Sequence, residues 1–215
     1  MSSLDLRKIP VLYMNLNQHV EKNENMQRIL TECGFENIQR IEGIDRPDNP
    51  IAGCGLAHLK ALDELEPPFI LLEDDCQVKN FRPVIDIPDD ADAVYLGISS
   101  WGRMNSHSGP NVQYEKIDGD LYRVHNMLSG HAILYLTKEY VDICQRVCYH
   151  YGYVTEEYHD IGFAEIQRFY NVYTFDEPMF YQMSGYHGTV NNLTSYPTQE
   201  FFTYNKQYWL PTRVY

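Results

Sequence analysis

The chain has 215 residues and a formal net charge of −13, from 17 lysines and arginines against 30 aspartates and glutamates. This length suits one α/β domain with a buried core, so we expect residues 1–215 to form a single domain, which could be the N-terminal part of a longer protein. Such an acidic chain would repel nucleic acid unless its basic residues gathered on one face. The sequence has no basic cluster, so we expect no nucleic-acid partner, whereas a divalent cation could still bridge carboxylates to a small phosphorylated ligand.

The cysteines and the apolar segments indicate a soluble cytoplasmic protein. None of the five cysteines forms a CxxC pair, so the sequence predicts neither a disulfide framework nor a structural zinc site. Cys144 and Cys148 are expected to be small core residues of a helix. The first residues lack the apolar stretch of a signal peptide, and no segment approaches the ~20 apolar residues of a transmembrane helix.

The first elements predict a βαβ unit. Residues 11–16 form a short apolar run, which is typical of a buried strand in an α/β sheet. Apolar residues at three-and-four spacing then predict a helix: Met26, Ile29, Leu30 and Cys33. Gly34 follows where a helix C-cap is expected, and residues 37–41 return to an extended pattern. Residues 43–48 have the composition of a loop.

The next segment places acidic residues at the end of a strand. Leucines at helical spacing predict a second helix: Leu56, Leu59, Leu62 and Leu65. Pro67-Pro68 ends this helix, and residues 69–72 form an apolar strand that runs into Glu73-Asp74-Asp75. Open α/β sheets bind ligands at the carboxyl ends of their strands. We therefore expect the acidic triplet to face a crevice, with a further strand at residues 93–96.

The second half predicts that the sheet is mixed. Residues 112–117 and 121–125 flank Asp118-Gly119, which is a strong hairpin signal. The remaining expected elements are a strand at 131–136, a helix at 138–149 that Thr137 begins as N-cap, a helix at about 161–170, and strands at 172–175 and 179–183. The fold class that follows is α/β, with a mixed central sheet flanked by helices.

The acidic triplet is the sharpest chemical feature of the sequence. Three adjacent carboxylates repel one another and call for a counter-cation. Mg²⁺ and Mn²⁺ prefer carboxylate oxygens and keep open positions for substrate phosphates. The triplet therefore predicts a divalent metal that holds a phosphorylated ligand. The alternative interpretation is a solvated acidic turn, because exposed carboxylates are common.

Seven segments between residues 10 and 184 stand out in order: VLYMNL, RIEGID, GCGLAHLKAL, FILLEDD, SGHAILYL, HDIGF and PMFYQ. They resemble the successive motifs of glycosyltransferase family 25 and its GT-A relatives. The LEDD segment alone would be weak evidence for the family. A GCxLxHL segment that precedes LEDD at this spacing is fairly specific to it. The resemblance implies a GT-A fold, which is Rossmann-like. Ala57 departs from the family, whose members often have serine there, and this puts a hydroxyl role in doubt.

The resemblance also implies a metal site. The triplet would take the part of the GT-A DxD motif, with Asp75 as the direct ligand of Mn²⁺ or Mg²⁺. Asp74 would touch the ribose or a metal-bound water, and Glu73, nearest the strand, would be mainly structural or a further ligand. His187 is the candidate for a late second ligand, although a lone loop histidine is more often a hydrogen-bonded surface residue.

The same resemblance implies the contacts of a UDP-sugar donor. The residues expected near the ribose and base are Asn15, Leu16 and Asn17, and those bordering the uracil are Glu42, Gly43 and Asp45. His58 and Lys60 would reach the phosphate or the donor sugar, and Gly130 with His131 would form the wall beside that sugar. Trp101 could stack on a sugar face, though a single aromatic side chain is more often simply packed.

Asp160 is the candidate catalytic residue. An inverting transferase needs a group that takes the proton of the acceptor hydroxyl, and Asp160 follows His159 in the HDIGF segment. Its competing interpretation is the N-cap of a helix that begins at Ile161. In a retaining reaction no such base is required, and Asp160 would instead hold hydroxyl groups of the acceptor or donor.

Together these features predict a metal-dependent glycosyltransferase. It would move a hexose or deoxyhexose from a UDP-sugar to a glycan or glycoprotein acceptor. Two alternatives stay open: a metal-dependent nucleotidyltransferase or phosphohydrolase, which would want a second set of ligands, and a non-catalytic sugar-binding module. No Walker A or GxGxxG segment supports an NTPase or a dinucleotide enzyme.

Overall fold

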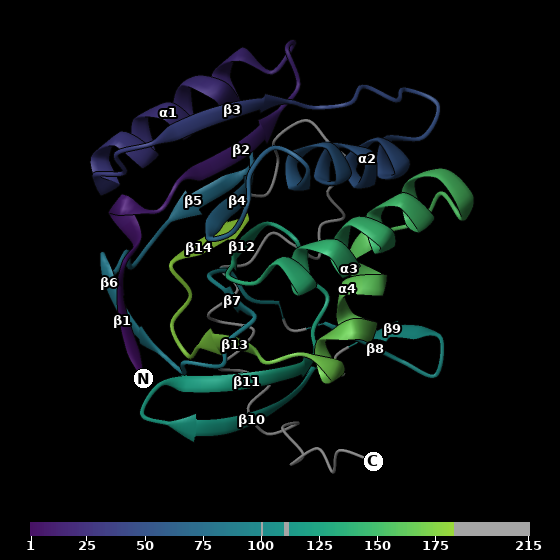
Figure 1. Ribbon diagram of the computed structural model, residues 1–215. Helices are drawn as coiled ribbons and strands as arrows, with labels where there is room; N and C mark the ends of the chain where they lie inside the picture. Colours follow the sequence, from purple (N-terminus) through teal and green to yellow (C-terminus); the bar gives the residue numbers. More distant parts are fainter. Residues whose placement is uncertain (100, 110–111, 183–215) are drawn as a thin grey trace.

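The central element of the computed structural model, which describes residues 1–99, 101–109 and 112–182, is a mixed sheet of eight strands (Figure 1). Its spatial order is β10 (Gln113–Asp118), β11 (Leu121–Asn126), β13 (Val172–Phe175), β7 (Ala93–Tyr95), β12 (Ala132–Tyr135), β4 (Phe69–Glu73), β2 (Val11–Asn15) and β3 (Ile38–Glu42). Strands β3, β2 and β4 run parallel, whereas β12 is antiparallel to both β4 and β7. The predicted α/β class with a mixed sheet is confirmed.

The N-terminal βαβ unit forms as the sequence predicts. Helix α1 (Val20–Cys33) connects β2 to the parallel strand β3. Gly34 ends the helix in the left-handed region at φ 82°, where a residue without a β-carbon is favoured. This unit fixes the carboxyl ends of β2 and β3 side by side.

Helix α2 (Pro50–Leu62) is shorter than its leucine spacing predicts. Asn49 caps its start by accepting a hydrogen bond from the Ala52 amide, and the helix ends at Leu62 with Asp63 as C-cap. The expectations that Leu65 belongs to the helix and that Pro67-Pro68 ends it are therefore wrong. Leu65 still packs against the same core from the following loop, which explains why its spacing matched. The acidic residues after Leu62 also disfavour a longer helix, because their negative charges repel the negative end of the helix dipole.

The two faces of the sheet are covered by different elements. Alternate side chains of β2 divide between two cores, Leu12 and Met14 on one face and Val11 and Tyr13 on the other. The first core is closed by α2, α3 (Lys138–Tyr149) and α4 (His159–Ile166), and the second by α1 and shorter strands. Cys144 and Cys148 are buried in the first core, as expected, and Thr137 caps α3.

Several short elements had no prediction. They are β1 (Ser2–Asp5), η1 (Leu6–Lys8), β5 (Cys76–Val78), β6 (Val84–Ile87), β8 (Gly102–Met104), β9 (His107–Gly109) and the π-helical turn η2 (His150–Val154). The helix expected at about 161–170 forms as α4, which begins at His159, and is followed by the 3-10 helix η3 (Gln167–Phe169). The last described strand, β14 (Phe180–Gln182), was expected and pairs with β5 immediately after the acidic triplet. Among helices of the described ranges, none has both the length and the apolar composition of a membrane span.

Gly97, which follows β7, provides a stability test of the packing beside the triplet. A β-carbon on Gly97 would lie 1.9 Å from Nε2 of the buried His131 ring, whose Nδ1 is 3.1 Å from the Ser129 hydroxyl. Gly97→Ala should lower the free energy of unfolding by about 1–3 kcal/mol, because the ring must move. Urea denaturation measures this change.

Gly55→Ala is the matched control. Gly55 is also buried, inside α2, but a β-carbon there would meet its nearest atom at an ordinary 3.5 Å. Alanine is favoured over glycine within a helix by about 1 kcal/mol, so this variant should be as stable as the parent or more so. Equal stabilities of Gly97→Ala and the parent would contradict the packing described at His131.

Candidate functional site

A cavity of about 190 Å³ lies at the carboxyl ends of the parallel strands β3, β2 and β4. The ends of β2 and β4, the loop after β3 and the first turns of α1 and α2 all contribute to its wall. The lining residues are Met14, Asn15, Leu16, His19, Lys22, Gly43, Ile44, Asp45, Arg46, Pro50, Gly53, Cys54, Ala57, Glu73, Asp74 and Asp75. The acidic triplet therefore borders a cavity at the edge where α/β sheets bind ligands.

The Asp75 carboxylate is buried at the wall of this cavity. Asp75 is 8 % exposed, and its Oδ1 has no hydrogen-bond partner among the residues that the structure describes. Burial, followed by the charge of Glu73, raises the pKa of Asp75 to about 7. A buried carboxylate oxygen without a partner is costly. A divalent cation from the cavity would satisfy this oxygen.

Asp74 is held by a cation of the protein itself. Lys22 Nζ lies 2.9 Å from Asp74 Oδ1, and the Asn15 amide donates to Oδ2 at 2.8 Å. His19 Nδ1 is 3.7 Å from the same Oδ2. Lys22 was not predicted from the sequence, because a lysine on a helix surface is usually solvated. Here it is 7 % exposed and lines the cavity.

Glu73 connects the cavity wall to the interior. Its Oε1 is 3.1 Å from His58 Nε2, and its Oε2 accepts a hydrogen bond from Gln182 Nε2 at 3.0 Å. Burial and then the charge of Asp74 raise the pKa of Glu73 to about 7. Both carboxylate oxygens thus have partners within the protein.

The residues expected around the nucleotide divide into two groups. Leu16, Gly43 and Asp45 line the cavity, as does Asn15, whose side chain binds Asp74 and accepts a hydrogen bond from Arg40 Nε at 3.0 Å. The other two expected residues, Asn17 and Glu42, are exposed outside the lining and are hydrogen-bonded to each other.

The residues expected near the phosphate and the donor sugar do not belong to the cavity lining. His58 is completely buried against Glu73, and Lys60 donates to the Glu42 carbonyl on the outer side of α2. The buried His131 follows Gly130, which lies beside Glu73 and His159. None of these four is in the lining of the described cavity. His187 lies outside the described residues.

The structure corrects one interpretation of Asp160. Helix α4 begins at His159 with Tyr158 as its N-cap, so the N-cap interpretation of Asp160 is wrong and the residue belongs to the first helical turn. Burial and the charge of Glu73 raise the pKa of Asp160 to about 7. A carboxyl group with this pKa suits proton transfer near neutral pH. Trp101, the candidate stacking residue, is half-buried and lies outside the cavity lining.

No protein-family model matches the chain, and no curated protein matches it. We therefore base the functional assignment on the site itself.

The raised pKa of Asp75 predicts a pH-dependent stability in metal-free protein. The folded state keeps the Asp75 proton up to pH about 7, whereas the unfolded chain releases it near the ordinary aspartate pKa of about 4. The free energy of unfolding therefore falls as pH rises from about 4 to about 7. Asp75→Asn cannot ionise, so its free energy of unfolding does not fall in this way. Relative to the parent, it should rise by about 2–3 kcal/mol between pH about 5 and about 8, at about 1.4 kcal/mol per pKa unit. Urea denaturation in the presence of a chelator measures this difference.

Asp48→Asn is the control for this titration. The guanidinium of Arg46 lowers the pKa of the exposed Asp48 to about 2, so its contribution changes only in more acidic solution. The difference in free energy of unfolding between Asp48→Asn and the parent should stay nearly constant between pH about 5 and about 8. A constant difference for Asp75→Asn as well would contradict the raised pKa.

Proposed function

We propose that the protein is a metal-dependent glycosyltransferase that transfers a hexose or deoxyhexose from a UDP-sugar to a glycan or glycoprotein acceptor. The observation that carries the proposal is the buried Oδ1 of Asp75, which has no hydrogen-bond partner among the described residues and borders a cavity at the carboxyl ends of parallel strands. A hard divalent cation, Mn²⁺ or Mg²⁺, fits a carboxylate oxygen in this position.

The residues around Asp75 support binding of a diphosphate. When bound, the cation would neutralise the diphosphate and make it a better leaving group. Lys22 adds a positive charge on the same wall, 2.9 Å from Asp74. Leu16, Gly43 and Asp45 line the cavity on the side of β2 and β3. They offer apolar contact, an exposed backbone and a carboxylate acceptor for the nucleoside. The resemblance to glycosyltransferase family 25 assigns nucleotide contacts to these three residues, and their place in the cavity lining supports the proposal.

Asp160 is proposed as the general base of an inverting transfer. The acceptor hydroxyl oxygen would bond to the anomeric carbon, the bond from that carbon to the diphosphate oxygen would break, and Asp160 would take the hydroxyl proton. Its raised pKa and its electrostatic interaction with Glu73 support this role. In a retaining transfer the same carboxylate would hold a hydroxyl group of the acceptor or donor.

Incubation of the protein with a panel of UDP-sugars, Mn²⁺ and candidate acceptors tests the proposal. A glycosyltransferase releases UDP from one of the donors at a rate that increases with the acceptor. Acceptor-independent cleavage of nucleotides would instead identify a phosphohydrolase or nucleotidyltransferase. Binding of sugar without any turnover would identify a sugar-binding module. Either of these last two results would overturn the proposed function.

A further inference from the structure

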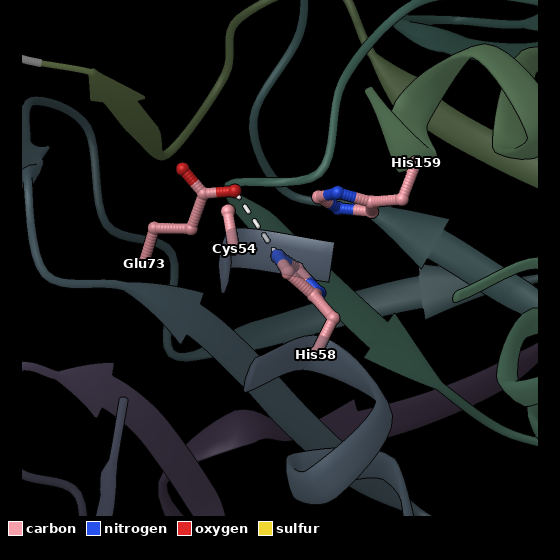
Figure 2. A group of neighbouring side chains, drawn as sticks. All are labelled: Cys54, His58, Glu73 and His159. Atoms are coloured by element: carbon pink, nitrogen blue, oxygen red, sulfur yellow. Dashed lines mark hydrogen bonds and ion pairs between the residues drawn. The ribbon is translucent and has the colours of Figure 1, made fainter. Parts of the chain in front are cut away.

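A second cluster of potential metal ligands shares Glu73 with the acidic triplet. It contains Cys54, His58, Glu73 and His159 (Figure 2), whose candidate ligand atoms all lie within 4.8 Å of one another. Cys54 and His58 are four residues apart on α2 and so share one face of that helix. Glu73 ends β4, and His159 begins α4. The cluster therefore connects three elements that are distant in the sequence.

The histidines of the cluster are buried and incompletely hydrogen-bonded. His58 is completely buried and His159 is 5 % exposed. Their ring centroids are 4.1 Å apart, and the His159 imidazole extends toward His58 and Glu73 (Figure 2). His58 Nε2 contacts Glu73 Oε1 at 3.1 Å, but His159 Nε2 has no hydrogen-bond partner among the described residues. An unsatisfied buried nitrogen of this kind costs free energy that a metal bond would recover.

Gly130 lies against two ligand atoms of the cluster. A β-carbon on Gly130 would lie 3.0 Å from His159 Nε2 and 3.4 Å from Glu73 Oε1. The missing side chain thus leaves these two ligand atoms facing the same small space. A tetrahedral ion with bonds of about 2.0–2.3 Å separates its ligand atoms by about 3.3–3.8 Å. Side-chain rotations that move these atoms by about 1 Å are enough to place them around one ion.

We propose that Cys54, His58, Glu73 and His159 form a binding site for one Zn²⁺ ion. One thiolate, two imidazoles and one carboxylate are ligands that zinc accepts in tetrahedral geometry, whereas Mg²⁺ and Mn²⁺ prefer oxygen ligands. On binding, the Cys54 thiol loses its proton to solvent and its sulfur bonds to the ion. Four protein ligands close the coordination sphere, which is the arrangement of structural rather than catalytic zinc.

The zinc site has a structural consequence that goes beyond the proposed transferase. It would join α2, β4 and the first turn of α4, and it would fix Glu73, the first residue of the triplet. Because His159 directly precedes Asp160, it would also hold that carboxylate in place. The site itself does not depend on the transferase activity, since its ligands are defined by their own geometry.

Metal content and cobalt spectroscopy of the full chain test the site. Chelator-treated protein is loaded with Zn²⁺, freed of excess metal by gel filtration and analysed by mass spectrometry, and a parallel sample is loaded with Co²⁺. We expect about one zinc ion per chain and a higher melting temperature in the loaded form. The Co²⁺ sample should show a thiolate-to-cobalt charge-transfer band and the intense visible bands of tetrahedral cobalt. Cys54→Ala should lose the charge-transfer band.

Two variants separate this site from other metal binding. Cys148→Ala removes a buried thiol on α3 that is not part of the cluster and should keep the zinc and the cobalt spectrum. Asp75→Asn should also keep both, even though it loses metal-dependent nucleotide-sugar binding. Folded parent protein that retains no zinc after gel filtration, or whose cobalt complex lacks the thiolate band, would overturn the zinc site while leaving the transferase proposal intact.

Discussion

Asp75→Asn is expected to weaken Mn²⁺-dependent binding of the UDP-sugar by more than about 100-fold, because loss of groups that only support a metal ligand already costs about 10–100-fold. The substitution keeps the shape of the side chain and removes its charge. It also removes a carboxylate whose burial is unfavourable when ionised, so the fold should persist. Isothermal titration with the UDP-sugar, with and without Mn²⁺, measures the loss.

Asp86→Asn is the matched control for the charge. Asp86 is an exposed aspartate on β6, outside the cavity lining, and its neutralisation changes the net charge of the chain by the same amount. This variant should bind the UDP-sugar like the parent. Mn²⁺-dependent binding that survives in Asp75→Asn would remove Asp75 from the metal site.

Asp160→Asn is expected to reduce the turnover rate by about 10²–10⁴-fold, the usual contribution of a general base. The affinity for the UDP-sugar should stay within a few-fold of the parent value, because the base acts on the acceptor. Steady-state transfer kinetics and donor titration separate these two quantities. Glu165→Gln, an exposed carboxylate on the same helix, is the control and should leave both unchanged.

The kinetic pattern of Asp160→Asn also distinguishes its two proposed roles. A lower kcat with an unchanged KM for the acceptor supports the general base of an inverting transfer. A higher KM with an unchanged kcat supports a residue that only holds a hydroxyl group. Turnover and KM that both equal the parent values would remove Asp160 from the reaction altogether.

The sheet was largely predictable because its strands are short apolar runs with clear boundaries. Residues 69–72 and 172–175 each contain only side chains that suit a buried strand, and β4 and β13 form there. Strand β1 was missed because its pairing with β6, Ser2 with Ile87, joins residues far apart in the chain. Such a pairing depends on tertiary contacts, which the local pattern of apolar residues does not predict.

The candidate site was predictable where strand ends determine it. The position of the triplet after β4 follows from the apolar run before it, and the cavity lies at that edge. Lys22 could not be distinguished from a solvated helix residue, because only the packing of α1 against the triplet places it beside Asp74. The proposed zinc ligands were missed for a related reason. Cys54 and His58 are close in sequence, but His159 reaches them only after α4 has packed.

The most direct test of the account is a crystal structure with Mn²⁺ and UDP, in which anomalous scattering locates the manganese. We expect one manganese ion within about 2 Å of an Asp75 carboxylate oxygen, with the UDP diphosphate on its open side and the nucleoside along Leu16 and Gly43. Manganese and UDP bound away from this cavity, with the Asp75 oxygen still unpaired, would contradict the account.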